Sequence, residues 1–208
     1  MKALLKISAV ALMFVLLSSS CAKTFYSVDS KVLAQKHHRS VAVMPSYISI
    51  APKGVYRKAV AEALEQQETI EALNFQKAIY AWMFKSKSNG KVNVDIQDIE
   101  ETNAKLKNAG YPETLLTDAR LCEILGVDGI ISSNFELTKP LSTSDVIAIA
   151  VATGIWLPAD EVRGTIAIID CANRKIIWSY QRKIEGEDLK TITNSFMKGA
   201  GKKMPYVK

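Results

Sequence analysis

The chain has 208 residues, of which 48% are hydrophobic and 23% are charged. This length suits one domain or two small ones, and the composition argues against collagen-like, disordered and polytopic membrane proteins. The 27 basic residues exceed the 21 acidic ones by only six. Because nucleic-acid binding needs a clustered basic surface, we expect no nucleic-acid partner.

The first twenty residues have the pattern of a signal peptide. Two lysines precede an apolar run of eleven residues, 7–17, and three serines then lead to Cys21. The run is too short to cross a bilayer as a helix, which needs about 20 residues. We therefore assign residues 1–20 to a signal peptide. Two outcomes are possible after such a signal: lipidation of Cys21, or ordinary secretion with cleavage after Ala22.

The sequence around Cys21 resembles a bacterial lipoprotein signal, in which the cysteine after the cleavage site is lipidated. The lipoprotein pattern prefers Leu three residues before the cysteine, a place that Ser18 holds here, with Leu17 one residue earlier. The resemblance implies acyl chains on Cys21, and several chains together anchor a protein stably in a membrane. Because Ala22 rather than Asp follows the cysteine, the resemblance implies the outer membrane, with the protein facing the periplasm.

Hydrophobic periodicity and Gly or Pro stops divide the rest of the chain. Residues 21–39 are polar and mixed, and we expect them to form a lipidated tether before one domain over residues 40–208. In chain order, the patterns predict a buried strand over 40–45, a long helix over 56–85, a strand over 91–97, short helices over 102–109 and 117–125, a central strand over 127–135, a hairpin of strands over 162–170 and 175–184, and a closing helix with Leu189, Ile192 and Phe196 on one face.

This order of elements predicts a single α/β domain with a mixed sheet, in two or three layers. Strands that alternate with helices pair in parallel through crossovers, whereas the last two strands form an antiparallel hairpin. Cys122 and Cys171 have two interpretations. They could form a disulfide in an oxidising periplasm, or each could be a buried thiol that packs as a small apolar side chain. We expect them to be unpaired.

Three blocks of sequence together resemble a family of envelope domains. They cover residues 41–45, 125–131 and 165–179, and each combines an apolar strand with a turn. Their order is similar to that in the periplasmic α/β domain of the curli-secretion channel protein CsgG and in related lipoprotein domains, including the TolB N-terminal domain and LpoB. Stretches at 96–103 and 204–206 are similar to uncharacterised Bacteroidetes lipoproteins. The resemblance implies a CsgG/TolB-N-like fold without an established activity.

Residues 146–157 form a twelve-residue stretch without charge. They could be a buried crossover helix or a contact surface for a partner or a membrane. A CsgG-type barrel needs spanning strands of about 9–11 residues each, so this stretch is too short for two of them. The predicted partner surface within it comprises Ile149, Ile155, Trp156 and Leu157.

The sequence contains little catalytic or metal-binding chemistry. His37 and His38 are the only histidines, and neighbouring side chains on an extended chain point to opposite sides, so we expect solvated tether residues rather than a metal site. The four acidic residues between 95 and 101 lie where a strand leads into a helix, which suits N-capping better than acid–base catalysis. We expect Asp128 and Asp170 to accept hydrogen bonds in turns or at strand ends rather than to act in catalysis. We expect no enzyme, cofactor or metal.

Together these patterns predict an outer-membrane-anchored periplasmic lipoprotein that acts as a non-enzymatic interaction or assembly module in the cell envelope. Its expected partners are the membrane, through the lipid on Cys21, and an unidentified envelope protein. The chain could also form homo-oligomers. The alternative is a subunit of an oligomeric CsgG-like secretion pore.

Overall fold

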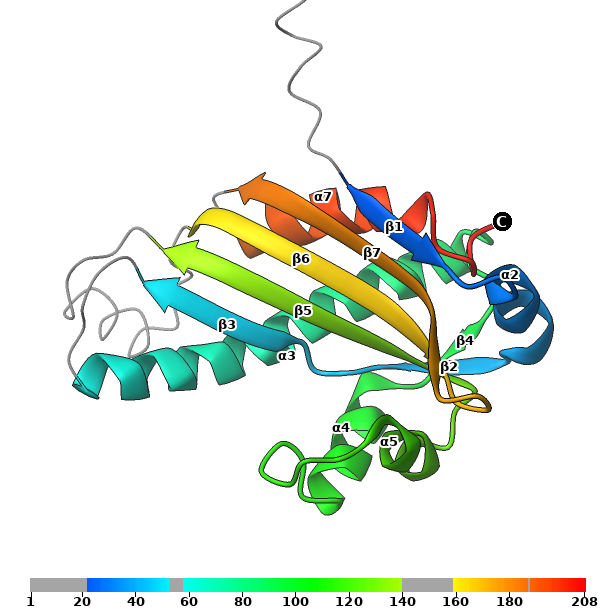
Figure 1. Cartoon of the computed structure of the whole chain (residues 1–208), viewed down its shortest axis with the longest axis horizontal. Coiled ribbons are helices and arrows are strands. Elements are labelled where there is room, and N and C mark those ends of the chain that lie inside the picture. The colour runs from blue at the N-terminus through cyan, green and yellow to red at the C-terminus, as the bar shows by residue number, and fades with distance from the viewer. Residues whose placement is uncertain (1–21, 53–57, 140–158, 187) are drawn as a thin grey trace, which may run out of the picture.

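The computed structural model describes residues 22–52, 58–139, 159–186 and 188–208 (Figure 1). Within these residues, seven strands form one mixed sheet in the order β1-β7-β6-β5-β2-β4, with β3 also paired to β5. The strands are β1 (Lys23–Tyr26), β2 (Ser40–Val43), β3 (Tyr47–Pro52), β4 (Asp95–Ile96), β5 (Gly129–Lys139), β6 (Ala159–Asp170) and β7 (Lys175–Gly186). The helices are α2 (Ser30–Val32), the π-helix η1 (Leu33–His37), α3 (Lys58–Ser88), α4 (Ile99–Asn108), α5 (Asp118–Leu125) and α7 (Leu189–Gly201).

The pairing pattern confirms the predicted mixed sheet. Strand β2 runs parallel to both β4 and β5, and β3 also runs parallel to β5. The remaining pairs, β5 with β6, β6 with β7 and β7 with β1, are antiparallel. The predicted central strand is β5, since it joins the parallel half of the sheet to the antiparallel half. The predicted hairpin is β6 and β7.

Helices cover the sheet on both faces, so the domain has three layers (Figure 1). On β2, Val41 and Val43 belong to the core beneath α3 and α7, whereas Ala42, and Met44 directly after the strand, belong to the core beneath α4 and α5. This alternation is expected because successive side chains of a strand point to opposite faces. None of the helices in the described ranges is long and apolar enough to span a membrane.

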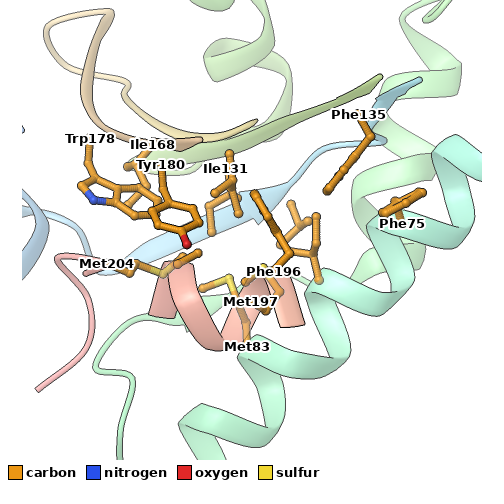
Figure 2. Close-up of a cluster of buried hydrophobic side chains, with 14 of the residues drawn as sticks. Phe75, Met83, Ile131, Phe135, Ile168, Trp178, Tyr180, Phe196, Met197 and Met204 are labelled. Carbon is orange, nitrogen blue, oxygen red and sulfur yellow. The ribbon is translucent and has the colours of Figure 1, made fainter. Parts of the chain in front are cut away.

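The larger core is built on aromatic side chains between the sheet and the pair α3 and α7 (Figure 2). Phe135 stacks on Phe75 of α3 with ring centroids 4.0 Å apart, and it meets the edge of Phe196 of α7 at 5.3 Å. Gly164 on β6 lies directly against Phe135 and Phe196, and an added Cβ there would be 2.8 Å from both rings. The close approach of the two rings therefore requires glycine at that position.

Local signals place the helix ends close to the predicted positions. The Asp98 side chain caps α4 by accepting hydrogen bonds from the backbone N–H groups of Glu100 and Glu101 at 2.8 and 3.2 Å. Thr117 caps α5 in the same way. Gly126 ends α5 with a φ of 65°, a left-handed conformation that favours glycine. The N-capping interpretation of the acidic cluster is thus confirmed at Asp98.

The prediction of a tether over residues 21–39 is wrong for its described part. Strand β1 pairs with β7 in a register that places Lys23 opposite Gln181 and Tyr26 opposite Trp178. The helical turns that follow bury Ala34 within the larger core. Four residues are too few to show strand periodicity, and the partner strand lies about 150 residues further along the chain, so the polar composition of the segment hid its fold.

Two other elements differ from the predictions. Strand β3 lies between the predicted strand over 40–45 and the predicted long helix over 56–85, where no element is predicted, and it buries Ile48 and Ile50 while Tyr47 stays exposed. The flanking prolines concealed this alternation. Conversely, only Asp95 and Ile96 of the predicted strand over 91–97 pair with β2, as strand β4. Val92 and Val94 are nonetheless buried, as the alternation implied.

Candidate partner-binding groove and buried polar network

A groove of about 1010 Å³ lies between α3 and α7, on the outer side of the larger core. Its apolar lining is formed by Ala78, Ala81, Trp82, Leu189 and Val207. Small residues open this space. Trp82 lies directly against Gly201, where an added Cβ would clash with the indole ring. Helices α3 and α7 therefore approach each other closely at Gly201, whereas the small side chains of Ala78 and Ala81 leave the space of the groove.

The charged residues of the groove are almost all basic. Its lysines are Lys85, Lys91, Lys190, Lys198 and Lys202, and all five are exposed. Among the described lining residues the one acidic residue is Asp188, which caps α7 by accepting two hydrogen bonds from Thr191. Hydrogen bonds from Thr191 lower the pKa of Asp188. Within the described residues, none of the five lysines forms an ion pair with an acidic side chain.

A buried hydroxyl in the groove lacks a hydrogen-bond partner. Thr193 lines the groove but is only 2% exposed, and its Oγ1 atom has no partner among the described residues. Leaving a buried polar group unsatisfied costs free energy, so native proteins pair most such groups with protein atoms, ordered water or a ligand. The groove thus combines an apolar floor, a basic rim and one free polar atom.

His38 belongs to a buried polar network rather than to a solvated tether. Its Nε2 forms a hydrogen bond with Asp170 Oδ1 at 2.7 Å, and its Nδ1 forms one with the Tyr206 hydroxyl at 2.6 Å. All three side chains are at least nine-tenths buried. The expectation that His38 is solvated was wrong, because its two partners lie more than 130 residues away along the chain. His37, its neighbour, is exposed as predicted.

The carboxylates of Asp128 and Asp170 at the strand ends both accept hydrogen bonds, as predicted. Asp128 Oδ2 accepts from the backbone N–H groups of Arg39 and Ser40 at 2.8 and 2.9 Å. Although desolvation opposes it, these bonds hold the pKa of Asp128 below its usual value. Asp170 Oδ2 accepts from the Asn173 N–H at 2.7 Å, which closes the turn between β6 and β7.

The network has the residue types of a catalytic constellation but is almost fully buried. Burial, together with the nearby carboxylates of Asp170 and Asp128, raises the pKa of Tyr206 well above its ordinary value. Gly129 lies so close that an added Cβ would be 2.7 Å from His38 Nδ1. The network joins His38, directly after η1, to the end of β6 and to the C-terminal segment, and the His38 side of it borders a pocket of about 480 Å³.

Cys122 and Cys171 form a disulfide, with their Cα atoms 5.5 Å apart. The expectation of two unpaired thiols was therefore wrong. The bond joins α5 to the turn after β6, within the smaller core. Neither the helix around one cysteine nor the turn at the other encodes their proximity, which follows from how α5 packs on the sheet.

The metal and acid–base chemistry considered from the sequence does not converge in space. Among the described residues, no group of three or more His, Cys, Asp and Glu side chains is placed to hold a metal ion. Asp95 makes an ion pair with Lys87, and Glu101 pairs with Lys105 at 2.6 Å. Asp95 and Glu101 of the acidic cluster thus have nearby lysine partners at the surface.

The predicted partner surface at Ile149, Ile155, Trp156 and Leu157 lies outside the described residues, and so does Cys21. The lipid anchor, the partner surface and the secretion-pore alternative therefore stay predictions. Sequence reasoning missed the α3–α7 groove. The sequence feature that could have indicated the groove is the spacing of Lys190, Lys198 and Lys202, which places them opposite the apolar face of the closing helix.

Neither a family model nor a curated protein matches this chain. Matching solved structures include a PelC dodecamer from Paraburkholderia phytofirmans, with 13% identity, coverage of 91% of this chain and 99% of that chain, and a TM-score of 0.39. The LpoB C-terminal domain from Salmonella enterica has 13% identity, coverage of 76% and 92%, and a TM-score of 0.37. Lipoprotein GNA1162 from Neisseria meningitidis has 11% identity, coverage of 79% and 95%, and a TM-score of 0.39. At these TM-scores and identities, the matches establish neither a family nor an activity.

Proposed function

We propose that this chain is a periplasmic lipoprotein, anchored in the outer membrane through Cys21, that binds an envelope protein and has no catalytic role. The signal pattern before Cys21 supports the anchor. The Cys122–Cys171 disulfide supports an oxidising compartment, because disulfides persist there and are rare in the cytosol.

The observation that carries the binding role is the α3–α7 groove. Its apolar floor and unpaired lysine rim complement an amphipathic segment that is acidic on its polar side. Trp82 is the expected anchor for an apolar side chain, since large aromatic residues in pockets contribute most to protein interfaces. The free Thr193 hydroxyl would take a polar atom of the bound segment. The partner is therefore an envelope protein that presents an acidic amphipathic segment.

Photo-crosslinking in cells tests the groove. The change Asn194→p-benzoylphenylalanine places the crosslinker in the groove, and Asn108→p-benzoylphenylalanine places it at the exposed end of α4 as a matched control. We expect a protein adduct from position 194 and none from position 108. Equal adducts from both positions would remove the groove as the binding site.

Charge reversal tests whether the partner is acidic. The double change Lys91→Glu and Lys190→Glu inverts two rim charges, one three residues after the end of α3 and one in the first turn of α7. We expect it to abolish the adduct at position 194. The control, Lys77→Glu with Lys175→Glu, changes the net charge equally at exposed sites outside the groove and should leave the adduct intact. If the adduct survives in the groove variant as well as in the control variant, the partner is not acidic.

The anchor has its own test. We expect the mature N-terminal peptide to carry acyl chains on Cys21 when its mass is measured, and the protein to sediment with outer membranes. Cys21→Ser should release it into the soluble periplasmic fraction. Cleavage after Ala22 with no lipid would overturn the anchor but not the groove.

A further inference from the structure

The fold begins almost immediately after the proposed lipidation site. Only Ala22 separates Cys21 from the first residue of β1, and consecutive Cα atoms are about 3.8 Å apart. Ala22 itself packs against the larger core, and β1 is hydrogen-bonded along β7. A lipid on Cys21 therefore could not hold the domain away from the bilayer, as the tether predicted from the sequence would have done.

Exposed apolar side chains lie along β1, which begins at this attachment point, and beyond its far end. Ten large apolar residues are exposed in the described part of the chain, and half of them surround β1. These five are Phe25, Tyr26, Val28, Val32 and Ile176. Ser27 donates its N–H to the Ile177 carbonyl, which brings Val28 beside Ile176. Aromatic residues at a water-exposed edge are typical of membrane interfaces, where the ring is apolar and its edge is polar.

The same region is positively charged. Residues 22–39 contain four basic residues and a single acidic one, Asp29. Lys203, after α7, adds a further cation at β1, where its Nζ donates to Thr24 Oγ1 at 3.1 Å and its carbonyl accepts from the Tyr26 hydroxyl at 2.6 Å. Basic residues beside an apolar patch are attracted to anionic lipid headgroups.

We propose that the β1 edge lies directly on the membrane, with Phe25, Val28 and Val32 at the boundary between the headgroups and acyl chains of a bilayer that contains anionic phospholipid. The proposal rests on the proposed lipidation of Cys21, which supplies the attachment. In this orientation, β1 runs along the bilayer surface. The α4–α5 pair lies on the side of the domain away from β1 and points into the periplasm (Figure 1).

Two fully exposed apolar residues provide a matched test of this orientation. Val28 is 101% exposed beside β1, and Leu115 is 99% exposed in the connection between α4 and α5. The full lipidated chain, with Val28→p-benzoylphenylalanine or Leu115→p-benzoylphenylalanine, is reconstituted into vesicles of phosphatidylethanolamine and phosphatidylglycerol and irradiated. Lipid adducts are then measured by the mass of the crosslinked peptide.

We expect about tenfold more lipid adduct from position 28 than from position 115, because the headgroup region is only about 5–10 Å deep. In vesicles of phosphatidylcholine alone, the adduct at position 28 should fall several-fold; an unchanged yield would overturn the role of the lysines. Equal yields from positions 28 and 115 would overturn the orientation, and crosslinks from position 28 to a second copy of the chain would identify β1 as a protein interface instead.

The mass of the N-terminal peptide from the same sample separates the two proposals. An acylated Cys21 without lipid adduct at position 28 would overturn the membrane contact and leave the lipoprotein function standing. A Cys21 without acyl chains would overturn the proposed function itself.

Discussion

The two faces of the sheet are stabilised in different ways. Beneath α3 and α7, 27 buried residues of the described part of the chain form one core, in which Phe135 contacts both Phe75 and Phe196. Beneath α4 and α5, the described residues contribute nine buried side chains to the core, none of them aromatic. There, a disulfide and bonds to the Leu125 carbonyl from Gln97 and Lys105 hold the short helices in place.

This difference follows from helix length. The 31-residue α3 and 13-residue α7 present enough apolar surface to stabilise their face by burial alone. The 10-residue α4 and 8-residue α5 cannot, so covalent and polar links supplement a small core. The larger core can therefore also tolerate an imperfect feature, the open groove with its unpaired hydroxyl, on its outer side.

The largest effect is expected from truncation in the larger core. Phe135→Ala removes the ring between Phe75 and Phe196, and we expect a loss of about 3–5 kcal/mol in the free energy of unfolding, measured in urea, because a cavity remains. Phe84→Ala, at a ring that is 55% exposed on the same helix as Phe75, should cost less than about 1 kcal/mol. Similar losses from both changes would contradict packing as the basis of this face.

Removal of the disulfide tests the smaller core. The double change Cys122→Ala and Cys171→Ala opens a loop of 49 residues, for which the chain-entropy estimate is a loss of up to about 4 kcal/mol. Reduction of the wild-type protein should lower its thermal midpoint in the same direction, while the double variant should not respond to reductant. A wild-type midpoint that reductant leaves unchanged would mean that the cysteines are unpaired after all.

A smaller effect is expected at Tyr206, which belongs to the larger core and bonds to His38. Tyr206→Phe removes the hydrogen bond to His38, and we expect a loss of about 0.5–1.5 kcal/mol near neutral pH. Because folding raises the pKa of Tyr206, its stabilising contribution is full below the unfolded pKa of about 10 and is lost as the pH rises through the folded value.

Urea unfolding of wild type and Tyr206→Phe at about pH 8 and about pH 11 checks the direction of this pH dependence. The stability difference between wild type and Tyr206→Phe should narrow at the higher pH, since the other tyrosines titrate in both proteins. A difference that widens with pH would show that the phenolate is accommodated in the fold.

The smallest effect on stability is expected at the groove. Thr193→Val removes the unpaired hydroxyl and keeps the shape of the side chain, so the free energy of unfolding should stay the same or rise slightly. The same change should weaken the partner adduct at position 194. A clear loss of stability in the isolated protein would show that the hydroxyl is satisfied within the fold, and the groove would lose one of its ligand-binding features.

Local sequence patterns were sufficient for most of the elements. Helix α3, the caps at Asp98 and Gly126, the central strand and the β6–β7 hairpin all follow from periodicity and stop signals within a few residues. The mixed sheet follows from the order of those elements. These features are predictable because the residues that determine them are neighbours in the chain.

Tertiary structure decided what joins distant residues. The pairing of β1 with β7, the Cys122–Cys171 bond and the burial of His38 each depend on partners 49 or more residues away. The groove likewise needs α3 and α7, which lie at separate places in the chain, to pack side by side. Such contacts carry no local periodicity. The sequence by itself determined the proposed lipid attachment at Cys21 and the α/β class, whereas packing of the whole chain decided which surfaces remain open beside that attachment.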